Sequence, residues 1–106
     1  MRTGNRNVVA ALAMATALQC TTVASAPTMI SAGNSVGSAT SPACAAGYAL
    51  TAGSCDNDAL TSGTIMNLYS DKASGSNTTW TCSAINHGSF PAHLTASAIC
   101  CRVPGK

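Results

Sequence analysis

Alternating small apolar and polar residues near the end of the chain predict a strand over residues 93–102. Successive side chains of a strand point to opposite faces of the sheet. Cys100 therefore shares a face with Ala98, and Cys101 points to the other face. A bond between the two neighbouring cysteines would need a strained ring, because disulfides prefer Cα atoms about 5.5–6 Å apart. We therefore expect Cys100 and Cys101 to have separate roles.

Three earlier segments also carry strand patterns: residues 47–52, 64–69 and 78–85. The first alternates large apolar with small residues, and the third combines β-branched threonines with Trp80. Gly, Pro and polar residues between the segments predict loops. Four sequential strands with short connections favour an antiparallel β-meander, so the sequence predicts a small all-β domain.

The N-terminal segment has the three-part pattern of a secretory signal peptide. Arg2 and Arg6 form a basic start, residues 8–18 form an uncharged apolar run, and small residues follow. The apolar run is shorter than the roughly 20 residues that a membrane-spanning helix needs. We therefore expect an exported protein with no transmembrane segment.

The end of the signal peptide has more than one candidate position. Cleavage after Ala24 or Ser25 follows small residues and keeps Pro27 away from the position directly after the cut. An alternative is lipid attached to Cys20 as a new N-terminal residue. Gln19 is not the small residue that such a site prefers, so lipidation is the less favoured alternative.

The composition divides the chain into three parts. Residues 1–25 are expected to form the signal peptide, residues 26–43 a linker rich in Ser, Ala and Gly, and residues 44–103 the folded domain. The linker is predicted to be flexible because it has few side chains that could pack. A spacer that holds the domain off a surface is the alternative role for it.

The expected domain has few large apolar side chains and therefore a small core. Folding a unit of about 60 residues costs roughly 1.5 kcal/mol of free energy per residue in lost conformational entropy. Burial of such a small core offsets this cost only narrowly. Disulfides each add about 2–4 kcal/mol, and they form in the oxidising compartments that exported proteins reach. The candidate disulfide cysteines are Cys44, Cys55, Cys82, Cys100 and Cys101.

The expected strand order suggests how these cysteines pair. If the first and last strands are antiparallel neighbours, Cys44 meets Cys100 or Cys101, and Cys55 is left to bond Cys82. Other pairings remain open, and one of the five cysteines has no partner. That cysteine could link two copies as a disulfide-bonded dimer, remain a buried free thiol or cap a small partner.

The charge balance argues against a nucleic-acid partner. The chain has five Lys and Arg residues, of which Arg2 and Arg6 leave with the signal peptide, and three Asp residues balance the remaining three. Phosphate backbones require clustered Lys and Arg. We therefore expect no nucleic-acid binding.

A spaced pattern of cysteine, glycine and aromatic residues resembles small exported bacterial proteins and modules of larger surface proteins. The pattern is Cys44-x-x-Gly47-Tyr48, Gly53-x-Cys55, Trp80-x-Cys82 and Thr95-Ala96-x-Ala98-Ile99-Cys100-Cys101. The resemblance covers about residues 44–102. It implies a disulfide-stapled β domain outside the cytoplasm, and it implies no particular activity.

The chain offers few groups for catalysis or metal binding. The acid–base candidates are His87, His93, Asp56, Asp58 and Asp71, and no serine has the strand–Ser–helix context of a nucleophile elbow. The two histidines and one thiolate of the terminal cysteine pair would give three zinc ligands, but the spacing matches no standard zinc site. Residues 56–58 begin like a calcium loop without its Gly and closing Glu. We expect a polar turn there, and no metal or cofactor.

His87, Phe90 and Tyr69 are the side chains that we expect to face a ligand. His87 and Phe90 fall in the predicted loop over residues 86–91. An exposed aromatic platform for sugars is an alternative role for Trp80 and the tyrosines, but Trp80 is more readily explained as core because few other residues are large enough.

The absence of a catalytic constellation favours a non-enzymatic binding module. We expect it to be secreted, periplasmic or envelope-associated, with a cell-surface polysaccharide or protein as partner. The alternative is a small secreted toxin or effector. A small hydrolase using His87 or His93 is the least supported hypothesis.

Overall fold

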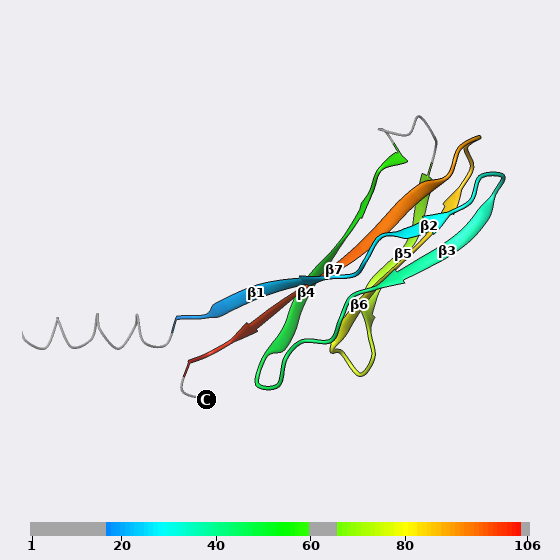
Figure 1. Cartoon of the computed structure of the whole chain (residues 1–106). Coiled ribbons are helices and arrows are strands. Elements are labelled where there is room, and N and C mark those ends of the chain that lie inside the picture. Colours follow the sequence, from blue (N-terminus) through cyan, green and yellow to red (C-terminus); the bar gives the residue numbers. More distant parts are fainter. Residues whose placement is uncertain (1–16, 60–65, 105–106) are drawn as a thin grey trace, which may run out of the picture.

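The computed structural model describes residues 17–59 and 66–104, which form an antiparallel all-β fold (Figure 1). The strands are β1 Gln19–Ala24, β2 Thr28–Ile30, β3 Ser35–Thr40, β4 Ala49–Asn57, β5 Met66–Ser74, β6 Thr79–Asn86 and β7 Ala92–Arg102. The predicted all-β class is confirmed. Within these residues no helix is long and apolar enough to cross a membrane. Residues 1–16 of the expected signal peptide and residues 64–65 of the expected second strand lie outside the described part.

β7 is the centre of the first sheet. β1 and β2 pair in succession along one of its edges, and β4 pairs along the other. Side chains of β7 alternate as the sequence predicts: Ala98 and Cys100 are fully buried, whereas Ser97 and Ile99 are only partly covered. The small residues on the inner face of β7 allow the second sheet to approach closely.

The second sheet has the order β3-β6-β5 and packs on the inner face of the first. Their shared core contains Ile30 from β2, Ala39 from β3, Ala84 from β6, and Leu94 and Ala96 from β7. Most of these side chains are small. The hydrophobic effect is roughly proportional to the apolar area removed from water, so this core stabilises the fold only modestly.

Glycines allow the sheets to touch at two points. A Cβ atom on Gly53 of β4 would lie 1.9 Å from Cδ2 of Trp80 in β6, and one on Gly37 of β3 would lie 2.7 Å from Cγ1 of Ile30. The sequence predicts a strand end at Gly53, but β4 continues through it. The glycine is needed there for the indole ring of the other sheet, not for a turn.

All six cysteines form disulfides: Cys20–Cys101, Cys44–Cys100 and Cys55–Cys82. The second and third bridges are pairings that the strand order suggested. Cys101, one of the two candidates for the spare cysteine, bonds Cys20 instead. The expectation of an unpaired cysteine, and of a dimer linked through it, is therefore corrected.

β2 and β3 occupy the segment for which composition predicts a flexible linker, residues 26–43. Ile30 and Ala39 are buried in the core, and backbone pairing to β7 and β6 holds both strands. Sequence composition missed them because each strand contributes only one or two core side chains. These two strands are held in place by pairing with β7 and β6, and their partner residues lie at least 41 positions later in the chain.

The strand connections also differ from a simple meander. The four expected strands correspond to β4–β7, and β1–β3 add three more. The chain passes from the first sheet to the second between β2 and β3, and β7 lies between β4 on one side and β1 and β2 on the other. The small domain is thus two packed sheets joined by the Cys55–Cys82 bridge.

Candidate functional site

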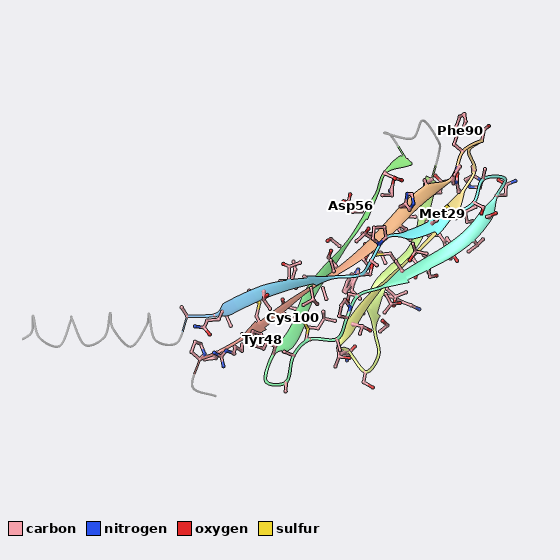
Figure 2. The ribbon with its side chains drawn as sticks, in the orientation of Figure 1. Met29, Tyr48, Asp56, Phe90 and Cys100 are labelled. Atoms are coloured by element: carbon pink, nitrogen blue, oxygen red, sulfur yellow. A yellow bond between two sulfur atoms is a disulfide. The ribbon has the colours of Figure 1, made fainter. Side chains whose placement is uncertain are left out.

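A cleft of about 480 Å³ lies on the first sheet where β7 begins and β4 ends. Its lining residues are Pro27, Asp56, Asn57, Asp58, His93 and Thr95. Strand register brings them together, because Asp56 is the pairing partner of Thr95 across β4 and β7. Figure 2 shows Asp56 and Met29 on the two strands that flank β7.

Asp58 and His93 are joined by side chain and backbone. His93 Nδ1 lies 2.9 Å from Asp58 Oδ2, and the backbone N–H of His93 donates to Asp58 Oδ1 at 2.6 Å. The backbone N–H of Asp58 donates in turn to the carbonyl of His93 at 3.3 Å. Both side chains remain accessible, with 48% of His93 and 44% of Asp58 exposed. The pair is therefore fixed in position and open to a ligand.

The hydrogen bonds at Asp58 favour its charged form. The backbone N–H of His93 is the main cause that lowers the pKa of Asp58 below its usual value, followed by the His93 side chain. Asp58 therefore presents a carboxylate at neutral pH. Asp56 adds a second carboxyl group to the same cleft.

The contact with Asp58 also defines the proton arrangement of His93. A carboxylate only accepts hydrogen bonds, so Nδ1 of His93 carries the hydrogen. In the neutral ring the lone pair is then on Nε2. The pair can thus accept hydrogen bonds from a ligand through Nε2 and through the remaining carboxylate lone pairs.

Apolar groups border this polar cleft. Met29 is the pairing partner of His93 across β2 and β7, and 59% of it is exposed. Directly opposed residues of an antiparallel pair lie on the same face, so Met29 lies beside the imidazole. Pro27 lines the cleft. The site therefore combines hydrogen-bonding groups with an exposed apolar surface.

Two of the expected ligand-facing residues, His87 and Phe90, lie in the β6–β7 loop and do not line the cleft. The buried side chain of Asn86 organises this loop, donating to the carbonyls of Ile30 and Phe90 at 3.0 and 2.8 Å. His87 Nδ1 lies 2.7 Å from Asn34 Oδ1, which links the loop to the β2–β3 turn. Phe90 projects from the tip (Figure 2).

Tyr69, the third expected residue, belongs to the other sheet. It is exposed on β5, at a break in the register between Leu68 and Ser70. β5 pairs with β6 and not with β7. The structure therefore does not bring Tyr69 together with the cleft residues.

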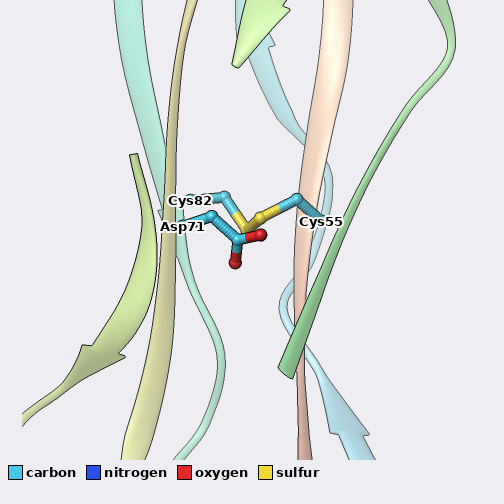
Figure 3. Close-up of side chains that lie close together, drawn as sticks. All are labelled: Cys55, Asp71 and Cys82. Carbon is cyan, nitrogen blue, oxygen red and sulfur yellow. A yellow bond between two sulfur atoms is a disulfide. The ribbon is translucent and has the colours of Figure 1, made fainter. Parts of the chain in front are cut away.

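Asp71 lies beside the Cys55–Cys82 bridge, as Figure 3 shows. The two sulfur atoms are bonded to each other, so they are not available as thiolate ligands for a metal ion. The indole N–H of Trp80 donates to Asp71 Oδ1. This cluster is explained by packing between the sheets. The zinc alternative also loses its thiolate, because Cys100 and Cys101 are both in disulfides.

No family model, curated protein or solved structure matches this chain. The cleft must therefore be interpreted from its own chemistry.

Sequence reasoning identified part of the cleft only. The sequence offers Asp56, Asp58 and His93 as acid–base candidates, but no local pattern indicates that Asp58 and His93 meet across 35 residues of chain. Pro27 and Met29 fall in the segment that composition predicts to be a linker. The expected polar turn over 56–58 is mostly the end of β4, which runs through Asn57.

Proposed function

We propose that this protein is a secreted or envelope-associated binding module that holds an uncharged sugar unit of a cell-surface polysaccharide at the Asp58–His93 cleft. The observation that carries the proposal is the fixed, accessible Asp58–His93 pair inside a cleft bordered by Met29. Ligand sites commonly combine a few fixed polar groups with an apolar wall.

The donor and acceptor set suits neighbouring hydroxyl groups. The carboxylates of Asp56 and Asp58 accept hydrogen bonds, Asn57 offers both kinds of group, and His93 accepts through Nε2. Met29 and Pro27 can contact the C–H face of a sugar ring. Two carboxylates repel anionic polymers, which favours uncharged sugars as the ligand.

Export is supported by the disulfides. Three bridges in a small chain are typical of proteins in oxidising compartments, and the N-terminal pattern of charged, apolar and small residues is typical of an export signal. A polysaccharide partner on a cell surface would be accessible to such a protein.

The test is binding of the exported protein to purified uncharged cell-surface polysaccharides, measured by co-sedimentation and calorimetric titration. His93→Ala should weaken binding at least tenfold, because it removes an acceptor and leaves Asp58 without its partner. His87→Ala is the matched control, an exposed histidine outside the cleft, and should bind like the wild type. Loss of binding in His87→Ala alone would move the site to the β6–β7 loop and contradict the proposal.

The Asp58–His93 pair also favours a second candidate function, a hydrolase. A carboxylate that holds an imidazole with its lone pair on Nε2 is an arrangement used for general-base catalysis. Release of reducing ends from a bound polysaccharide, lost in His93→Ala and kept in His87→Ala, would favour this function. Binding without release would favour the binding module.

A further inference from the structure

β1 lies just before Pro27 of the cleft in the chain, and every residue of this strand is paired with β7. β1 pairs with β7 over six positions, from Gln19 opposite Arg102 to Ala24 opposite Ser97. The side chain of Arg102 adds a hydrogen bond from Nε to Gln19 Oε1 at 3.1 Å. β1 thus covers one edge of β7 along its second half (Figure 1).

A covalent bond fixes the same strand. Cys20 bonds Cys101 across 81 residues of sequence. Cys101 is only 6% exposed in the folded chain. Without Cys20, the sulfur of Cys101 would be a thiol in a protein whose other four cysteines are paired with one another.

Pairing continues past β1. The backbone N–H of Ser25 donates to the carbonyl of Ala96 at 2.8 Å, and the backbone N–H of Ala96 donates to Ser25 Oγ at 3.1 Å. Cleavage after Ala24 or Ser25 would therefore remove a complete strand and leave a row of backbone groups on β7 without partners. Such unpaired strand edges promote aggregation.

We infer that the export signal ends at Ala17, so that the exported chain begins with Leu18 and keeps Cys20. The inference rests on the proposed export. Residues 15–17 read Ala-Thr-Ala, a small-x-small cleavage signal followed by leucine and not by proline. Residues 8–14 remain as the apolar segment, at the short end of the roughly 7–15 residues that such segments span.

The chemical step is hydrolysis of one amide bond by a signal peptidase. Water adds across the Ala17–Leu18 bond, the hydroxyl going to the carbonyl carbon of Ala17 and a proton to the nitrogen of Leu18. No electron transfer is involved. Lipid attachment at Cys20 is incompatible with this product, because the lipid thioether would use the sulfur that bonds Cys101.

The test is the intact mass and N-terminal peptide of the full chain after export from a bacterial host, alkylated without reduction. We expect an N-terminus at Leu18, no alkylated thiol, and a mass lower by the six hydrogens that three disulfides remove. An N-terminus at Ser25 or Ala26 with an alkylated Cys101 would overturn the inference, as would lipid on Cys20. An uncleaved chain beginning at Met1 would overturn it together with the export part of the proposed function.

Two variants provide an independent test in the same assay. Ala17→Phe places a bulky residue at the inferred cut and should reduce processing at least tenfold. Ala24→Phe is the matched control, since it blocks a cut after position 24 and lies at an exposed site. It should be processed like the wild type. Blocked processing in Ala24→Phe with normal processing in Ala17→Phe would contradict the inference.

Discussion

Asp58 and His93 hold each other through three hydrogen bonds, two of which use backbone N–H groups. A side-chain contact alone would leave the imidazole free to rotate away, whereas the backbone contacts fix the position of the carboxylate. Preorganisation of this kind lowers the entropy that a ligand must remove on binding. The arrangement depends on where β4 ends relative to β7, and no local sequence pattern encodes that position.

Replacing Asp58 with Asn should weaken the dependence of stability on acid pH. The pKa of Asp58 is lowered in the folded protein, so the unfolded chain takes up a proton first as the pH falls. The stabilisation is complete above the ordinary aspartate pKa of 3.8, which applies to the unfolded chain, and is lost as the pH falls through the lower folded value. Asp58→Asn lacks this contribution.

Urea unfolding midpoints between about pH 6 and pH 2 measure this effect. The midpoint of the wild type should fall more steeply below about pH 4 than that of Asp58→Asn. Asp56→Asn is the matched control, a carboxyl group in the same cleft, and should keep the steep fall. Equal slopes in the wild type and Asp58→Asn would show that the contacts with His93 do not persist in solution.

At the scale of elements, the alternation of β7 is the part of the fold that sequence predicts best. Its inner face is Ala, Leu and Cys, its outer face is mostly polar or β-branched, and burial alternates with a period of two from Ala92 to Cys100. The sequence also predicts β6 nearly to its ends, because β-branched threonines and Trp80 favour a strand, and the expected strand over 78–85 corresponds to Thr79–Asn86. Where a strand has its own alternating pattern or a local run of strand-favouring residues, the sequence alone locates it.

β1, β2 and β3 lack such a pattern, and sequence reasoning missed them. β1 is almost entirely exposed, and β2 and β3 bury few side chains. Their positions follow from the hydrogen-bonding capacity of β7 and β6 and from the Cys20–Cys101 bond. Long-range pairing of this kind is not visible in a short sequence window. The apolar side of the cleft could not be predicted for the same reason, because Pro27 lies between β1 and β2 and Met29 lies in β2.

The contact between β4 and β6 gives a prediction about sheet packing. In Gly53→Ala the new Cβ would meet the Trp80 ring at 1.9 Å from Cδ2, so the ring or the sheet must move. Overpacking of this kind typically costs about 1–3 kcal/mol of unfolding free energy. Ser54→Ala, at the exposed neighbouring position, should change stability by less than about 0.5 kcal/mol. Urea unfolding of the two variants compares them directly, and equal stability would mean that the sheets are not in contact at Gly53.

For the whole molecule, the disulfides compensate for a core of small residues. Ile30 and Leu94 are the largest fully buried aliphatic side chains in the described residues. The three bridges connect β1 to β7, the β3–β4 loop to β7, and β4 to β6. Edge strand β1, the loop before β4 and the contact between the two sheets are thus covalently fixed.

Reduction of all three disulfides should therefore unfold the protein. Each bridge contributes about 2–4 kcal/mol, and the stability of a small domain is about 5–15 kcal/mol in total. Amide chemical-shift dispersion in NMR spectra should collapse on reduction at neutral pH and room temperature. Protein treated with alkylating agent but not reduced is the control and should keep its dispersion. A well-dispersed spectrum of the reduced protein would show that the core is sufficient by itself.

Pairing of Gln19 with Arg102 places the beginning of β1 and the end of β7 at one pole of the molecule, while His93 lies nine positions back along β7. At about 3.3 Å per residue, the cleft is roughly 30 Å from that pole. A fluorescent protein fused after β7, or a biosensor surface coupled ahead of β1, would therefore stand clear of the cleft. The same geometry would let the molecule be displayed on a particle by either end with its cleft directed outward.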